Sequence, residues 1–183
     1  MAAIHHPDVQ DLLDRQAITD VLHRYCRAVD RRDPDLLLSA YHGDAVDDHG
    51  VYKGPASGLV EFMLNDGRAV VHHQISNIVI EVDGDVARTE CYLDAVHRRE
   101  DETGRWDELL KCRYIDRFER REGAWRIAHR RVVYDWGRIE PATEGWWDVI
   151  EGDWTFGSRD RSDPVYEHGP WWPGAHGERR ESL

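Results

Sequence analysis

The side chains best suited to acid–base chemistry in this sequence are two adjacent histidines and one distant aspartate. His72 and His73 begin a run rich in β-branched residues, 70–82, which predicts a long central strand. Imidazole is the side chain whose ordinary pKa lies nearest neutrality. Asp30 ends a predicted helix, 8–30, where the helix dipole disfavours an anion by about 0.3–1 kcal/mol. Its carboxylate therefore needs a cation or a donor, and we expect Asp30 and His73 to form a dyad.

Simpler roles for these residues are kept open. A histidine on a strand is commonly a core residue satisfied by the backbone, and His72, on the opposite face from His73, suits that role. Adjacent strand residues cannot chelate one ion together, and the sequence has no HExxH motif or cysteine cluster, so no metal is expected. The simplest alternative partner for Asp30 is a neighbouring arginine: Arg27, Arg31 or Arg32.

Composition limits the partners. A chain of 183 residues with a net charge of −12 predicts a globular protein that binds neither nucleic acid nor an anionic membrane. The first seven residues lack the features of a signal peptide, and no apolar run approaches the roughly 20 residues that span a membrane. Cys26, Cys91 and Cys112 lack CxxC spacing and are interpreted as reduced core thiols. We therefore expect a cytoplasmic protein.

The elements that must position the dyad follow from periodicity. Apolar residues at helical spacing predict the helix 8–30, and Asp33 followed by Pro34 predicts a second helix directly after a tight corner. A short strand is expected over 45–49 and a third helix over 56–64. The rest predicts a four-stranded meander: 70–82, 86–98, 106–119 and 124 to about 136. The expected class is α+β, a curved antiparallel sheet wrapped around the first helix.

Alternation along two strands predicts a concave face. On strand 86–98, mostly small residues share one face, which leaves room in front of it: Ala87, Thr89, Cys91, Leu93, Ala95 and His97. On the last strand the same alternation groups Trp125, Ile127, His129, Arg131 and Val133. It therefore predicts that Arg131 faces the cavity beside Ile127, where it could bind an anionic group of a substrate.

The C-terminal part has a different composition. Residues 137–183 hold five of the eight tryptophans but show little periodicity. Such aromatic content predicts that this extension packs on the body or on a neighbouring subunit. The expected organisation is one domain over residues 1–136 and a Trp-rich extension over 137–183.

Four stretches carry a resemblance to a known family: Arg24-Tyr25-Cys26-Arg27-Ala28-Val29-Asp30, His72-His73-Gln74-Ile75-Ser76-Asn77, Val82-Asp83-Gly84-Asp85 and Gly123-Ala124-Trp125-Arg126-Ile127-Ala128-His129-Arg130-Arg131. Over about residues 8–136 the chain resembles the nuclear transport factor 2-like superfamily. More narrowly, it resembles the SnoaL-like group that includes scytalone dehydratase, bile-acid 7α-dehydratase and hexachlorocyclohexane dehydrochlorinase. The resemblance implies a cone-shaped α+β barrel and a homotrimer.

The resemblance also implies site residues. The dehydratase pattern falls on Tyr25, Asp30 and His73, with His97 as a further polar catalytic residue. The arginine of the bile-acid enzyme falls on Arg131 or Arg130. His49 stands near a tyrosine position of scytalone dehydratase, and with Tyr41 and Arg131 it completes the candidate substrate-binding set. The alternative for Tyr25 and Tyr41 is packing at the helix–sheet boundary.

These residues together predict a cofactor-independent lyase. The expected activity is dehydration of a hydroxylated polycyclic or alicyclic ketone, steroid-like or polyketide-like, by a His–Asp dyad in a closed apolar pocket. The dehydrochlorinase lysine has no counterpart, which disfavours dehalogenation. An isomerase or cyclase with the same dyad, and a non-catalytic small-molecule binding protein, are the alternatives.

Overall fold

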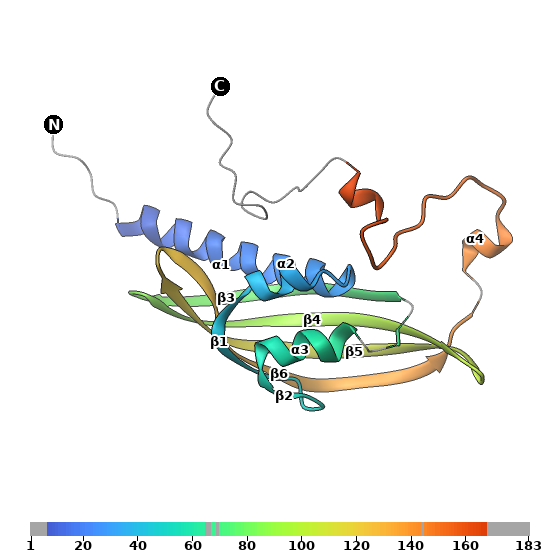
Figure 1. The fold of residues 1–183 in the computed structure, drawn as a ribbon, viewed down its shortest axis with the longest axis horizontal. Helices are drawn as coiled ribbons and strands as arrows, with labels where there is room; N and C mark the ends of the chain where they lie inside the picture. The colour runs from blue at the N-terminus through green and yellow to red at the C-terminus, as the bar shows by residue number, and fades with distance from the viewer. Residues whose placement is uncertain (1–6, 65–66, 69, 144, 168–183) are drawn as a thin grey trace, which may run out of the picture.

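Helices cover one face of a six-stranded sheet (Figure 1). The computed structural model describes residues 7–64, 67–68, 70–143 and 145–167. The strand order is β2-β1-β6-β5-β4-β3, antiparallel except for the parallel β1–β6 pair. The expected α+β class with a long N-terminal helix is confirmed, and the sheet stays open between its edge strands β2 and β3. The elements are α1 (Pro7–Asp30), α2 (Pro34–Ser39), β1 (Tyr41–Asp48), β2 (Lys53–Pro55), α3 (Ala56–Leu64), β3 (Val70–Asp83), β4 (Val86–Asp101), β5 (Gly104–Arg121), β6 (Ala124–Pro141), α4 (Trp146–Val149) and η1 (Pro164–Tyr166).

The corner after α1 fixes the position of Asp30, the last helical residue. Arg32 adopts a left-handed conformation with φ 48°, and the Asp33 N–H donates back to the Ala28 carbonyl at 2.9 Å. This is the hydrogen-bond pattern that commonly closes helices, here with arginine where glycine is usual. Asp33 then caps α2 by accepting from the Leu36 N–H at 3.1 Å, as its sequence position predicted.

Packing between α1 and the sheet forms the core. The inward face of α1 is completely buried at Ile18, Leu22 and Tyr25. The predicted inner face of β4 is confirmed, since all six of its members are buried: Ala87, Thr89, Cys91, Leu93, Ala95 and His97. Small residues along this strand leave space between the sheet and the helices.

β-Bulges on β3 and β6 interrupt the alternation of side chains. One lies between Ser76 and Val79, where Asn77 has φ 51°, and two more lie on β6. Each bulge inserts one extra residue, so the residues beyond it exchange faces. The face of each side chain on β3 and β6 therefore depends on which side of a bulge it lies.

The last strands are longer than periodicity predicted. β5 and β6 stay paired as far as Trp106 opposite Pro141, so β6 runs five residues beyond the expected end at Trp136. The sheet consequently continues across the expected boundary between residues 136 and 137. The first residues of the predicted extension are sheet, not tail.

Residues 158–167, which we call the C-terminal clasp, pack against the corner between α1 and α2. Asp163 is 4% exposed, accepts hydrogen bonds from the Ser158 and Val165 N–H groups and pairs with Arg31 at 3.2 Å. Arg159 donates to the carbonyl oxygens of Val29 at 3.3 Å and of Arg68 at 2.8 Å. The clasp therefore holds the residues on both sides of Asp30.

Between β6 and the clasp, residues 145–157 form an arm that extends beyond the sheet (Figure 1). Its apolar side chains include Trp147, Ile150 and Phe156, all exposed, and the Trp147 and Phe156 rings contact each other with centroids 6.0 Å apart.

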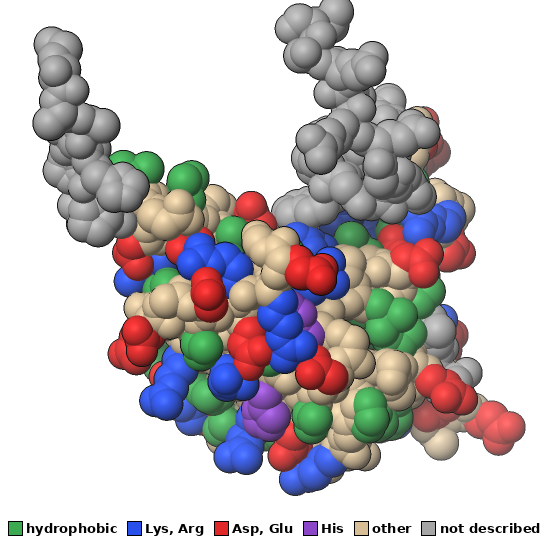
Figure 2. Space-filling view, turned by 60° about the vertical axis from the view of Figure 1, so that its left-hand side comes forward, with side chains coloured by type: hydrophobic (Ala, Val, Ile, Leu, Met, Phe, Trp, Pro, Cys, Tyr) green, Lys and Arg blue, Asp and Glu red, His purple; other side chains and the backbone are tan. Residues whose placement is uncertain are grey.

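Elsewhere acidic and basic side chains are interspersed over the face seen in Figure 2. No helix among the described residues is long and apolar enough to cross a membrane.

Candidate active site

A cavity of about 890 Å³ lies between the inner face of the sheet, the end of α1 and α3. This volume lies within the range of about 300–1,000 Å³ typical of small-molecule sites. Most of the lining is apolar, and a few charged or titratable side chains face it. The lining residues are Val29, His49, Gly50, Val51, Phe62, Met63, Arg68, Val71, His73, Leu93, Ala95, His97, Glu108, Leu110, Cys112, Tyr114, Val132, Tyr134, Gly137, Arg138 and Ile139.

Asp30 and His73 are in direct contact at the wall of this cavity. The His73 Nδ1 atom lies 2.7 Å from Asp30 Oδ1, and the His73 backbone N–H donates to Asp30 Oδ2 at 3.2 Å. Both side chains are largely buried, 14% exposed for Asp30 and 7% for His73. With a proton on Nδ1 donated to the carboxylate, Nε2 is the ring nitrogen that can accept another proton. The two donors from His73 also compensate the carboxylate for its place at a helix C-terminus.

The dyad has a second side. Asp30 and His73 also line an outer cleft of about 410 Å³, together with His23, Arg27 and Arg31. His73 faces both spaces, whereas Asp30 lines the outer cleft and not the main cavity. The carboxylate is thus reached from the opposite side to the apolar cavity.

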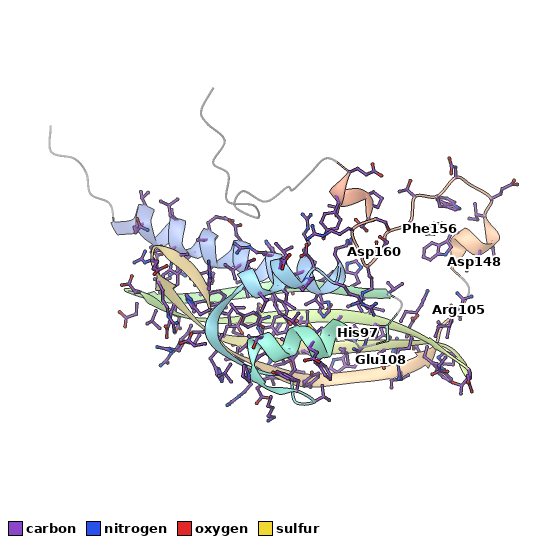
Figure 3. The ribbon with its side chains drawn as sticks, in the orientation of Figure 1. His97, Arg105, Glu108, Asp148, Phe156 and Asp160 are labelled. Atoms are coloured by element: carbon purple, nitrogen blue, oxygen red, sulfur yellow. The ribbon has the colours of Figure 1, made fainter. Side chains whose placement is uncertain are left out.

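A second histidine–carboxylate pair lies beside the dyad. His97 on β4 is directly opposite Glu108 on β5, and its Nδ1 atom lies 3.6 Å from Glu108 Oε2 (Figure 3). The His97 ring centroid is 5.4 Å from that of His73. Arg99 and Arg68 also contact Glu108, at 2.6 and 3.4 Å. Glu108 is therefore in contact with three ionisable side chains, of which His97 and Arg68 line the cavity with it and Arg99 does not.

A hydrogen-bonded network lies behind the opposite wall. His49 lines the cavity, bonds to Asp47 through Nδ1, and lies 3.1 Å from the Tyr25 hydroxyl through Nε2. Tyr41 donates to the other Asp47 oxygen at 2.6 Å. Tyr25 and Tyr41 are 0% and 2% exposed and do not line the cavity. They support His49 from behind, which differs from the catalytic role expected of Tyr25 and from the direct substrate contact expected of Tyr41.

The expectation that Arg131 faces the cavity is wrong. Arg131 is 63% exposed and approaches Asp48 at 4.0 Å on the solvent side. The reason is a β-bulge: Phe118 pairs with Ile127 and Arg117 with His129, so residue 128 is extra and the alternation reverses. His72 is also exposed and is not the core histidine expected.

The bulge turns Arg130 inward instead, into the core beneath the cavity. Arg130 and Asp116 are both 0% exposed and share two hydrogen bonds of 2.8 and 2.6 Å. The Arg130 guanidinium lies over the rings of Tyr25 and Tyr114, 4.0 and 3.9 Å from their centroids. Burial raises the pKa of Tyr25, against the opposing effect of Arg130. Arg130 is therefore a buried structural cation and does not line the cavity.

Sequence reasoning missed Glu108, Asp47 and Asp116. A usable signal existed for Glu108, because the two-residue turn Glu102–Thr103 joins β4 and β5. Counting outward from this turn places Glu108 opposite His97.

Among the described residues no group of three or more His, Cys, Asp or Glu side chains is placed to hold a metal ion. The site as described is built from acid–base groups and arginines.

Comparison with known proteins places this architecture in a family. The SnoaL-like domain family matches residues 10–131, and the chain belongs to it. Similar solved structures include the hexachlorocyclohexane dehydrochlorinase LinA-type3 from Novosphingobium barchaimii LL02, with 23% identity, a TM-score of 0.66 and coverage of 75% of this chain and 97% of that one. A scytalone dehydratase-like protein from Novosphingobium aromaticivorans has 19% identity, a TM-score of 0.62 and coverage of 74% and 91%.

LinA itself has 25% identity, a TM-score of 0.64 and coverage of 71% of this chain and 91% of its own. The search of curated proteins found no match. Similarities at this level establish the fold, and the domain match over residues 10–131 establishes the family. They leave the reaction of this chain to be argued from its own residues.

Proposed function

We propose that the protein is a cofactor-independent dehydratase of a hydroxylated polycyclic or alicyclic ketone. The observation that carries this proposal is the 2.7 Å contact between Asp30 and His73 at the wall of a largely apolar cavity of about 890 Å³. An imidazole held by a carboxylate is a general base, and an apolar cavity of this size suits a ring system with few polar groups.

In the proposed reaction, His73 Nε2 removes a proton from the carbon next to the substrate carbonyl. Asp30 holds the opposite ring nitrogen, which fixes the tautomer and stabilises the imidazolium that forms. The β-hydroxyl then leaves as water with a proton from His97, and a carbon–carbon double bond conjugated to the carbonyl remains. General acid–base catalysis of this kind contributes on the order of 10²–10⁴ in rate.

The test combines a substrate screen with two substitutions. Cyclic β-hydroxy ketones are screened for the ultraviolet absorbance of the conjugated product. The product must also have lost water, because isomerisation alone releases none. His73→Ala and Asp30→Asn should each remove most turnover, and the double variant should be little worse than the poorer single variant, because groups that act as a unit are non-additive. Full activity in folded His73→Ala protein would reject the dyad and favour a binding protein.

We also propose that the chain forms a trimer, as the resemblance implies. Support comes from the arm of residues 145–157, whose exposed Trp147, Ile150 and Phe156 present apolar surface. Sedimentation of the full chain tests this, and a monomer at micromolar concentration would reject it.

A further inference from the structure

We infer that Glu108 is a positioning residue that holds His97 as the acid for the leaving hydroxyl, an inference that rests on the proposed function. Both residues line the cavity, so the acid and its carboxylate lie on the same wall as the base His73. The register of the sheet and the contacts of Glu108 support this role.

The register places the two side chains together. His97 and Glu108 are direct cross-strand partners and therefore share one face of the sheet. His97 Nδ1 lies 3.6 Å from Glu108 Oε2, within ion-pair reach though longer than a hydrogen bond. Catalytic contacts are often this long before substrate binds. Figure 3 shows the two labelled side chains next to each other.

Glu108 is itself held in place. Arg99 Nε contacts its Oε1 atom at 2.6 Å, and Arg68 Nε approaches its Oε2 atom at 3.4 Å. The backbone of Arg68 is fixed in turn, because its carbonyl accepts from Arg32 at 3.0 Å and from Arg159 of the clasp at 2.8 Å. The Glu108 carboxylate is 13% exposed, and its two arginine contacts restrict its orientation.

In the proposed step the two neighbouring imidazoles have different roles. With centroids 5.4 Å apart, His73 and His97 repel each other if both are protonated. Before the step, His97 carries the proton and His73 is neutral. The C–H proton goes to His73, the electron pair forms the double bond, the C–O bond breaks, and the His97 proton completes the water. The pair thus holds one proton before and after the step, and Glu108 stabilises the starting arrangement.

The charged groups around His97 define what the experiment must separate. His73 faces it from β3, Glu108 from β5, and Arg99 and Arg68 act through Glu108. Removing the carboxylate should make His97 lose its proton at lower pH. The matched control is Asp107→Asn, because Asp107 is the next residue on β5, is bonded to Arg98 by two contacts of 2.8 Å, and does not line the cavity.

The experiment follows the histidine resonances of the full chain by NMR as a function of pH, with His97→Gln used for assignment. In Glu108→Gln the His97 titration should move to lower pH, and in Asp107→Asn it should not move. Glu108→Asp, which keeps the charge, should lie between Glu108→Gln and wild type. Unchanged His97 titration in Glu108→Gln would overturn the inference. If Glu108→Gln does not fold, the double variant Glu108→Gln/Arg99→Gln also removes the Arg99 guanidinium that would be left without its carboxylate. The His97 titration of this double variant is then compared with that of wild type in the same way.

The kinetic arm uses the β-hydroxy ketone found in the absorbance screen. Glu108→Gln should lower kcat about tenfold or more with KM within about threefold, and the alkaline limb of its pH–rate profile should move to lower pH. In a His97→Gln background the same substitution should have no further effect. An unchanged kcat and alkaline limb would overturn the inference. A moved His97 titration in a protein that dehydrates no screened ketone would instead reject the proposed function and leave only the contact.

Discussion

Asp116→Asn should destabilise the protein strongly, because it leaves Arg130 charged and unpaired in the core. Both side chains are completely buried, and two hydrogen bonds of 2.8 and 2.6 Å join them in parallel. The guanidinium is enclosed by Tyr25 and Tyr114, whose rings contribute cation–π attraction but no counter-charge. An asparagine offers one acceptor oxygen and no charge. Because the guanidinium is completely buried, solvent does not compensate for the lost carboxylate charge.

The size of the effect follows from that burial. Removing one partner of a buried ion pair costs about 3–5 kcal/mol. For a protein of this length each kcal/mol lowers the melting temperature by about 2–4 °C, so Asp116→Asn should melt about 6–20 °C below wild type. Replacing both partners, in Asp116→Leu/Arg130→Met, should recover most of this loss, since a buried pair is often no better than apolar residues of similar volume.

Thermal and urea unfolding measure these differences, and the chain supplies a matched control. Arg113 and Asp135 form a similar two-contact pair at 3.0 and 2.9 Å, but their side chains are 30% and 41% exposed. Asp135→Asn should cost less than about 1 kcal/mol. Equal losses for Asp116→Asn and Asp135→Asn would refute the reasoning, because Arg113 is reached by solvent and keeps a second partner, Glu90, at 3.0 Å.

Three further predictions concern the cavity, acid stability and the clasp. Burial raises the pKa of Cys112 to about 11, so its alkylation by iodoacetamide should be slow near neutral pH and faster as the pH rises. A ligand that fills the cavity lined by Cys112 should slow the alkylation again, and mass spectrometry of the modified peptide measures both effects. Hydrogen bonds from Arg98 lower the pKa of Asp107. Asp107 therefore stabilises the fold at pH values above its ordinary pKa, and this contribution is lost as the pH falls. Asp107→Asn should flatten the decline in melting temperature between about pH 5 and pH 2. Asp163→Ala removes the acceptor for two backbone N–H groups and the partner of Arg31. It should lower the free energy of unfolding by about 1–3 kcal/mol and expose the clasp to limited proteolysis. An unchanged cleavage pattern would show that the clasp holds without Asp163.

Local patterns were sufficient for most of the elements, though not for the far ends of β5 and β6, and for one face of the site. The spacing of apolar residues predicted α1, the Asp33–Pro34 pair predicted the start of α2, and strict alternation predicted the buried face of β4 through His97. These features depend on residues a few positions apart. They required no knowledge of which strands pair.

The face of Arg131 could not be predicted in the same way. Alternation holds only while a strand gains no extra residue, and the bulge at residue 128 is visible only in the pairing of β5 with β6. The bulge at Asn77 has the same effect on β3, but it lies beyond His73 and so left the dyad unaffected. The register of His73 was therefore predictable from alternation, whereas the face of Arg131 was not.

In the proposed reaction, the two-sided position of the Asp30–His73 pair would separate the routes of substrate and proton. Asp30 lines the outer cleft and His73 lines both spaces, so a ligand that fills the apolar cavity leaves the carboxylate side of the pair open to water. Small buffer acids and bases can then reach Asp30 without entering the cavity. An inhibitor that seals the cavity would consequently block substrate but not proton exchange at the dyad, and the two forms of access could be altered by different substitutions.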